Sequence, residues 1–208
     1  MPTPTPDYFT IGSNDDPARR YFLRKSIARP AGTSTQWLFT RFRSRDLFRH
    51  SPGSHFALAL RAELGFEPDG VPCTISGRGI TLGDTSLASP DPAVPEQASP
   101  RYGGARGAQV ESFWHGGNFL YRETGLLPDG LRDGCWYHVH LHVHDERWIA
   151  FWIDDASGER IAGPAVVQDD PGHPVTPGRT GVVIALGRGA DETGPWEAEF
   201  RDISSGWF

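Results

Sequence analysis

The stretch that decides the fold is Trp136 to Asp154, which reads WYHVHLHVHDERWIAFWID. In its first half histidine alternates with valine or leucine, and in its second half isoleucine and phenylalanine occupy every other position. A period of two is typical of β-strands, because successive side chains of a strand point to opposite faces. The pattern therefore predicts two strands joined by a short turn.

The register of this predicted hairpin depends on the length of its turn. A three-residue turn, Asp145 to Arg147, places His144 opposite Trp148, whereas a two-residue turn would move the tryptophans to the valine face. We expect the three-residue turn, because it keeps both apolar triplets in the core. The apolar face then consists of Val139, Leu141, Val143, Ile149, Phe151 and Ile153. The opposite face consists of His140, His142, Trp148, Ala150 and Trp152.

The row His138, His140, His142 and His144 leaves three interpretations open. Histidines two apart on a strand are about 7 Å apart, so two of the rings can converge on one zinc ion. His138, His140 and His142 are the candidate ligands, and a neighbouring strand would have to supply another. Alternatively, imidazole beside indole suits sugars, because rings stack on pyranose faces and nitrogens bond hydroxyls. In the third interpretation the row is simply the polar outer face of a sandwich.

Similar period-two segments recur along the chain and are separated by Gly- and Pro-rich turns. No stretch of twelve residues shows a clean helical period, and only Pro17 to Tyr21 and Ser44 to Phe48 suggest short helices. The chain is therefore predicted to be an antiparallel all-β sandwich or barrel. In Ser54 to Leu64, the alternation predicts one core-facing row, which consists of Phe56, Leu58, Leu60, Ala62 and Leu64. The other predicted strands are Tyr21 to Ile27, Thr35 to Arg43, Pro72 to Ser76, Gly79 to Leu82, Gln109 to His115, Asn118 to Arg122, Arg160 to Ala162, Gly181 to Gly187 and Trp196 to Ile203.

The 208 residues are expected to form a single sandwich domain over residues 35–208. Residues 1–34 are expected to be an N-terminal extension that includes the first strand. Two Pro- and Gly-rich stretches, Ala88 to Ala108 and Gln168 to Arg179, are predicted to be loops. A loop as long as the first is either a functional rim or flap, or an insertion.

Composition excludes some functions. The net charge of −6 disfavours nonspecific binding of nucleic acid, and no apolar run is long enough to span a membrane. The first residues do not resemble a signal peptide. The compartment stays open between cytoplasm, virion and secretion after processing. Cys73 and Cys135 are the two cysteines, and they can form a disulfide or be separate small buried residues.

The hairpin also resembles a known family. The pattern W-Y-x-V-x-L-x-V, a short turn, I-x-F-x-I-D and then Gly158 is similar to laminin-G-like and glucanase-like members of the concanavalin A-like lectin/glucanase superfamily. Gly181 to Gly187 and the ending Phe200 to Phe208 resemble the strands that follow in such domains. This resemblance covers about residues 35–208 and implies a two-sheet jelly roll, while it says little about chemistry.

The enzymes of this superfamily have characteristic catalytic motifs, and this sequence can be compared with each of them. The E-x-D-x-x-E triplet of laminarinase-type glycosidases, which supplies the acid and the nucleophile, is missing from the sequence. Arg61-Ala62-Glu63-Leu64 resembles the Arg-x-Glu-Leu strand of alginate-lyase-like members, and His115 and Tyr121 would complete the site out of pattern. By alternation Arg61 and Glu63 share an outer face, where they can form an exposed ion pair or hold an acidic sugar.

The sequence therefore favours binding of a glycan or polysaccharide without catalysis, by a lectin-like jelly roll with no nucleic-acid partner. The predicted contacts are Trp114, His115, Tyr121, Arg122, His140 and His142. One alternative is a polysaccharide lyase or glycoside hydrolase that uses Arg61, Glu63, His115 and Tyr121. Another is a structural module of a bacterial or phage assembly, buried in a homo-oligomer. No cofactor is predicted; besides the candidate zinc ligands, calcium could bind at Asp15-Asp16, Asp154-Asp155 or Asp169-Asp170.

Overall fold

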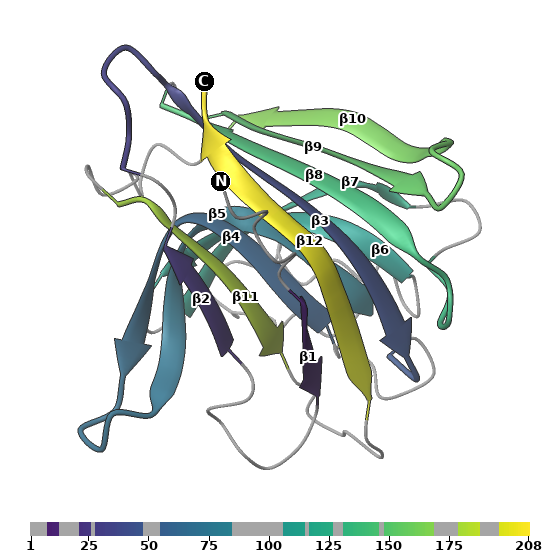
Figure 1. Ribbon diagram of the computed structural model, residues 1–208, viewed down its shortest axis with the longest axis horizontal. Helices are drawn as coiled ribbons and strands as arrows, with labels where there is room; N and C mark the ends of the chain where they lie inside the picture. Colours follow the sequence, from purple (N-terminus) through teal and green to yellow (C-terminus); the bar gives the residue numbers. More distant parts are fainter. Residues whose placement is uncertain are drawn as a thin grey trace, which may run out of the picture.

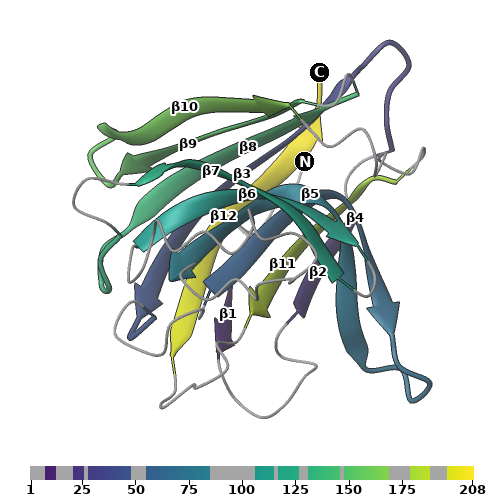
Figure 2. The ribbon, with the colours of Figure 1, turned by 180° about the vertical axis from the view of Figure 1, so that it is seen from behind.

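The computed structural model describes residues 8–12, 21–25, 28–47, 55–84, 106–114, 117–126, 131–145, 148–168, 179–187 and 196–208. These residues form two six-stranded antiparallel sheets, which Figures 1 and 2 show from opposite sides. Sheet A has the order β1 (Tyr8–Gly12), β12 (Glu197–Trp207), β3 (Thr35–Arg45), β8 (Tyr137–His144), β9 (Trp148–Asp155) and β10 (Arg160–Gln168). Sheet B has the order β2 (Tyr21–Lys25), β11 (Gly181–Gly187), β4 (His55–Phe66), β5 (Pro72–Asp84), β6 (Arg106–Trp114) and β7 (Gly117–Leu126).

The predicted all-β sandwich is confirmed, and so is the predicted register of the hairpin. His140 pairs with Trp152 and Val139 with Ile153, as the three-residue turn requires. The six apolar side chains of β8 and β9 are at most 2% exposed and belong to the core between the sheets. Phe56 of β4 packs edge-on against Phe42 and Phe200 of sheet A, which ties the two sheets together.

Several predicted elements need correction. The two segments expected at Pro72 to Ser76 and Gly79 to Leu82 form the single strand β5, because the chain continues extended between them. The short helix expected at Ser44 to Phe48 is wrong, since β3 runs through Arg45. Of the helix expected at Pro17 to Tyr21 only Tyr21 is described, and it begins β2. Most of both predicted loops also lies outside the described residues, although Arg106 to Ala108 belong to β6.

The N-terminal segment supplies one edge strand to each sheet. β1 pairs with β12 in sheet A, and β2 pairs with β11 in sheet B. Cys135 is a free, exposed thiol, so the disulfide with Cys73 is not formed. In the described part of the chain, no helix has the length and hydropathy of a membrane span.

The core-facing row predicted for β4 is correct only for its first half. Phe56, Leu58 and Leu60 belong to the core between the sheets. Ala62 and Leu64 instead join a second hydrophobic cluster, which contains Ala57, Ala59, Val183 and Ala185, on the outer face of sheet B. The reason is a β-bulge at Arg61, whose φ is 52° and at which the pairing with β5 shifts. One extra residue in a strand moves every following side chain to the opposite face.

Three polar side chains on the inner face of β3 hold irregular parts of the backbone. Gln36 is 0% exposed; its Oε1 accepts the N–H of Arg61 at 2.9 Å, and its Nε2 donates to the carbonyl oxygen of Thr180 at 2.8 Å. Thr40 Oγ1 donates to the carbonyl oxygen of Arg201, beside a second bulge in β12. Ser44 Oγ donates to Asp133 at 2.8 Å. The buried side chains of Gln36, Thr40 and Ser44 thereby each have a hydrogen-bond partner.

Replacing Gln36 with leucine is expected to lower the free energy of unfolding by about 1–3 kcal/mol, because the Arg61 N–H and the Thr180 carbonyl lose a buried partner. Urea denaturation measures the change. Thr10→Leu on the exposed face of β1 is the control and should change the free energy of unfolding by less than about 0.5 kcal/mol. An equal effect of the two substitutions would contradict the cross-sheet role of Gln36.

Candidate functional site

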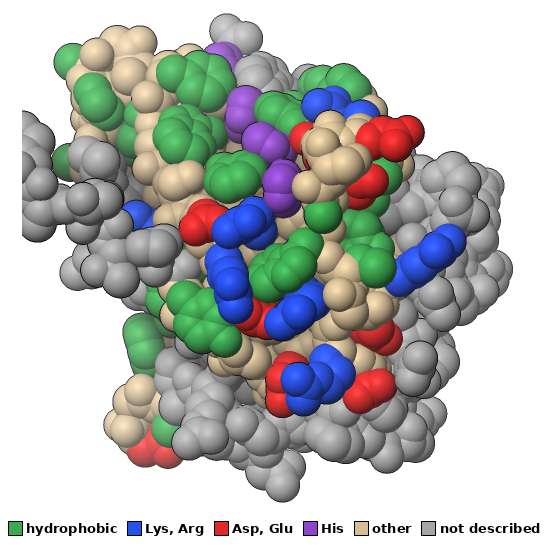
Figure 3. Space-filling model, turned by 45° about the vertical axis from the view of Figure 1, so that its right-hand side comes forward, with side chains coloured by type: hydrophobic (Ala, Val, Ile, Leu, Met, Phe, Trp, Pro, Cys, Tyr) green, Lys and Arg blue, Asp and Glu red, His purple; other side chains and the backbone are tan. Residues whose placement is uncertain are grey.

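The histidine row of β8 lies on the outer face of sheet A. His138, His140, His142 and His144 are all partly buried, because side chains of the neighbouring strands stand beside them. Figure 3 shows histidine side chains in a row across this face, with hydrophobic side chains on both sides. The face therefore combines polar nitrogen atoms with apolar rings.

Ring contacts join the histidines to both neighbouring strands. The His140 ring stacks on Trp152 of β9 with centroids 4.5 Å apart and an interplanar angle of 11°. His142 meets Trp152 edge-on at 5.0 Å and Phe208 at 5.2 Å, while Phe39 of β3 lies 4.9 Å from His140. We call this surface the aromatic platform. It consists of Trp37, Phe39, His140, His142, Trp152 and Phe208.

Trp37 lies against the backbone of β12 because residue 206 is glycine. A Cβ atom on Gly206 would be 2.9 Å from Trp37 Nε1 and 3.0 Å from both Cε2 and Cζ2. Since Gly206 pairs with Trp37 across the two strands, the missing side chain lets the indole lie over the strand. Trp37 was not among the predicted site residues.

Burial keeps the platform histidines uncharged at neutral pH. Desolvation lowers the pKa of His140, and the nearby Asp154 only partly opposes it. Desolvation also lowers the pKa of His142. Each ring is then a neutral imidazole with one N–H donor and one acceptor nitrogen.

A cluster of arginines surrounds Trp136, which directly precedes β8. The guanidinium groups of Arg41, Arg43 and Arg201 lie 5.9, 4.9 and 5.0 Å from the centre of its ring. Carboxylates fix these arginines: Glu199 bonds Arg43 at 2.6 Å and Arg201 at 2.7 Å, and Asp202 pairs with Arg41. We call this group the Trp136 cluster. It adjoins the platform, because Arg41 follows Phe39 by two residues on the same face of β3.

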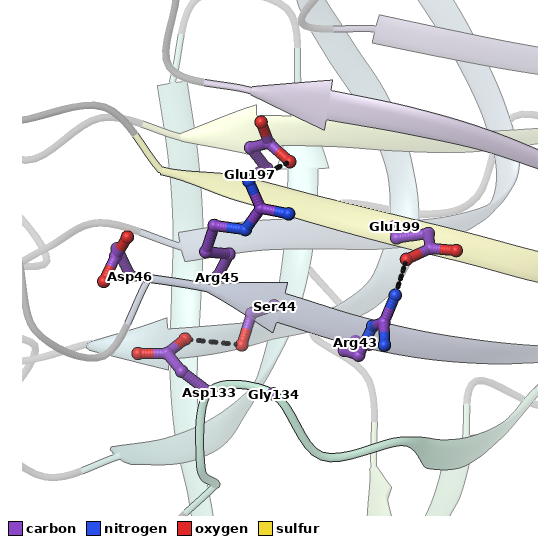
Figure 4. Close-up of a pocket in the computed structure, with 8 residues that line it drawn as sticks. All are labelled: Arg43, Ser44, Arg45, Asp46, Asp133, Gly134, Glu197 and Glu199. Carbon is purple, nitrogen blue, oxygen red and sulfur yellow. Dashed lines mark hydrogen bonds and ion pairs between the residues drawn. The ribbon is translucent and has the colours of Figure 1, made fainter.

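A polar pocket of about 340 Å³ lies beyond the Trp136 cluster, at the end of β3 (Figure 4). Its lining consists of Arg43, Ser44, Arg45, Asp46, Asp133, Gly134, Glu197 and Glu199. Asp133 accepts hydrogen bonds from Ser44 and from the N–H of Leu47, so it forms a fixed wall. Arg45 and Glu197, 3.9 Å apart and with side chains 74% and 49% exposed, form a looser rim.

Sequence reasoning missed the carboxylates of the pocket, among them Glu197 and Glu199. Glu197 and Glu199 are two apart on β12 and therefore share a face with a spacing of about 7 Å. Their alternation in WEAEF is the available signal, but the arginines they meet belong to a distant strand. A glycosidase acid needs a raised pKa. Although desolvation opposes it, hydrogen bonds from Arg43 and Arg201 lower the pKa of Glu199, which suits a fixed hydrogen-bond acceptor.

The predicted contact residues are divided between the two sheets. His140 and His142 lie on sheet A, whereas the backbones of Trp114, Tyr121 and Arg122 lie on β6 and β7 of sheet B. The side chains of those three residues, and all of His115, lie outside the described part. The platform therefore contains only the two histidines of the predicted set.

The exposed outer position predicted for Arg61 beside Glu63 is wrong, because Arg61 is buried and its side chain reaches sheet A. Arg61 is 4% exposed; its guanidinium donates to Asp145 at 2.9 Å and lies 4.1 Å from the Trp207 ring centre. Glu63 pairs instead with Arg179 at 2.6 Å. Arg61 thus links sheet B to sheet A and is not available to a polymer. This removes the residue that most favoured a lyase.

In the described part of the chain, no group of three or more His, Cys, Asp or Glu side chains lies close enough together to hold a metal ion. Zinc binding by His138, His140 and His142 stays a prediction. Asp155 caps its own turn by accepting hydrogen bonds from Ser157 and Glu159, and Asp154 pairs with Arg160. Asp15-Asp16 and Asp169-Asp170 lie outside the described residues.

Comparisons with known proteins show the fold. No protein-family model and no curated protein sequence matches the chain. The binding domain of botulinum neurotoxin DC in complex with SialylT has a TM-score of 0.51 at 10% identity, covering 95% of this chain and 38% of that one. A second structure comes from work on botulinum neurotoxin type C, whose cell entry is described as dependent on interaction with two ganglioside molecules. Its TM-score is 0.50 at 10% identity, and the match covers the same shares of the two chains.

A third similar structure is the CBM2 module of the evolved Dit protein of Lactobacillus casei phage J-1. Its TM-score is 0.48 at 14% identity, and the match covers 90% of this chain and 70% of that one. The chain spans about two fifths of the length of the two toxin structures. What the toxin domains share with this chain is the β-sandwich fold.

The lowered pKa values of His140 and His142 predict that stability falls as the pH drops below about 6.5. In that range the unfolded histidines bind protons and the folded ones do not, so the free energy of unfolding decreases with decreasing pH. Asp154 and Arg160 face His140, and Arg41 faces His138, from the adjoining strands. The lowered pKa values of Asp145 and Glu199 change the free energy of unfolding only below about pH 4.

Urea denaturation between pH 5 and pH 7.5 tests this expectation. The variant H140Q/H142Q should show a flatter dependence of the unfolding free energy on pH than the parent chain. An unchanged slope would show that these two histidines are not the groups held neutral.

Proposed function

We propose that this chain binds glycans, without catalysis, at the aromatic platform. The observation that carries the proposal is the parallel stack of His140 on Trp152, with His142 edge-on to the same indole. A neutral imidazole can both donate to and accept from hydroxyl groups, and an indole offers apolar area beside it. A sugar presents the same combination, with apolar C–H groups on its faces and hydroxyls at its edge.

The apolar rings lie on both sides of the histidines. Trp152 is on β9, while Trp37 of β3 and the 57% exposed Phe208 lie on the other side. Because Trp37 pairs with His142, a pyranose on the Trp37 indole has an imidazole within reach of its hydroxyls. Rings already held by packing lose little conformational freedom when they bind a ligand.

The similar structures support the β-sandwich fold on which this proposal depends, but they do not support a particular ligand. Their descriptions name SialylT in complex with one toxin binding domain and two ganglioside molecules that interact with botulinum neurotoxin type C. At 10% identity a shared architecture does not transfer a binding site, because function depends on the particular side chains. The proposal therefore rests on the platform itself.

An assembly interface is the alternative that the same surface supports. Exposed aromatic side chains also favour protein partners, and Phe208 would be buried if two copies joined through sheet A. The partly buried, neutral histidines favour the sugar, since each offers hydroxyl groups both an N–H donor and an acceptor nitrogen beside an apolar ring.

Affinity electrophoresis in gels that contain laminarin, galactan, mannan, xylan, alginate or hyaluronan tests the proposal. At least one polysaccharide should retard the parent chain, and Trp152→Ala and His140→Ala should each weaken that binding about tenfold. Phe66→Ala is the matched control, because Phe66 is a 56% exposed aromatic residue at the end of β4 in sheet B, away from the platform, and this variant should bind normally.

Two results would overturn glycan binding at the platform. One is no retardation in any gel, and the other is retardation that neither substitution changes. If light scattering instead shows a dimer that Trp152→Ala dissociates, the platform is an assembly interface.

A further inference from the structure

The polar pocket continues the surface of the aromatic platform. Trp136 precedes His138 and His140 by two and four residues, and the alternation of the strand places all three on one face. Arg43 belongs to both the Trp136 cluster and the pocket lining. Figure 3 shows arginine side chains and a hydrophobic group next to the histidine row, on the same face of the molecule. Platform, Trp136 cluster and pocket thus form one path along β3 and β8.

The chemistry of the pocket suits hydroxyl groups. No aromatic or aliphatic side chain is among its described lining residues, so an apolar ligand gains nothing there. Guanidinium donors lie next to carboxylate acceptors, as in the pairs Arg43–Glu199 and Arg45–Glu197 (Figure 4). Adjacent hydroxyls of a sugar can donate to the carboxylate and accept from the guanidinium, and such charge-assisted hydrogen bonds are the stronger kind.

The charges of the pocket favour an uncharged sugar. Its lining contains four carboxylate side chains and two arginines, so a uronic acid or sulfated sugar would be repelled. Arg41 and Arg201 of the neighbouring Trp136 cluster, with Asp202, bring the whole region close to balance. A positively charged sugar would therefore gain little electrostatic attraction from this region.

We propose that the polar pocket is a second subsite, which binds the hydroxyl-rich edge of one unit of an uncharged oligosaccharide whose other units lie on the platform. This rests on the proposed function. Phe39 of the platform and Arg43 of the pocket are four residues apart on β3, which is about 13 Å at the rise of a strand. That span exceeds one sugar ring, so only a chain of several units reaches both, and the linked contacts reinforce one another.

A microarray of gluco-, galacto-, manno- and xylo-oligosaccharides, from disaccharides to decasaccharides, tests the subsite, with uronic-acid and sulfated series beside them. Binding of the parent chain should strengthen with length in a neutral series. The variant R45A/E197Q, which changes only the exposed rim, should bind the long chains about tenfold more weakly and the disaccharides equally. The control R179A/E63Q removes another partly exposed Arg–Glu pair, on sheet B, and should leave binding unchanged.

The outcomes separate the two proposals. If Trp152→Ala abolishes binding while R45A/E197Q binds long chains normally, the pocket is not a subsite and the platform remains one. Binding that is independent of length, or stronger for acidic chains, also overturns the subsite. If the parent chain binds no sugar on the array, both proposals fail.

Discussion

The pairing of β8 with β9 in a single register determines both the core and the candidate site. With His140 opposite Trp152, both apolar triplets of the hairpin enter the core, and the histidines face outward. A shift by one residue would break up the apolar face and put tryptophans against the valines. Buried imidazoles would also need polar partners that an apolar core lacks. The turn of the hairpin therefore places the histidines on a surface where indoles from β3 and β9 surround them.

The sequence was sufficient for this hairpin because its information is local: a strict alternation, two apolar triplets and a turn whose length sets the register. It was not sufficient for the two bulges. Arg61 and Asp202 adopt φ values of 52° and 53°, and neither is the glycine that usually marks such a conformation. The one indication of the bulges in the sequence was in β3, where the inner positions Gln36, Thr40 and Ser44 are polar in an otherwise apolar row. A polar residue in the core of a sandwich indicates irregular backbone opposite it.

Only part of the site could be predicted, because periodicity carries local information and the site also depends on which strands are neighbours. The alternation identified His140, His142 and Trp152 as one face, but it could not show which strands adjoin that face. Trp37 belongs to the platform because β3 pairs with β8 and because β12 has a glycine beneath the indole. Arg43 meets Glu199 across 156 residues of chain. Such contacts depend on the order of the strands in the sheet, and the periodicity of the sequence does not reveal that order. The pocket could therefore not be predicted from the sequence.

The ion pairs around Trp136 make better sense as positioning devices than as sources of stability. Exposed pairs of this kind contribute at most about 1 kcal/mol each, since solvent screens them and ordering two long side chains costs entropy. Glu199 nevertheless holds two arginines at once, and both rest against the same indole. Arginines fixed in this way present their remaining N–H groups in set directions, and a ligand that uses them need not order them again. The platform achieves the same result by ring packing, so both halves of the outer face are arranged before a ligand arrives.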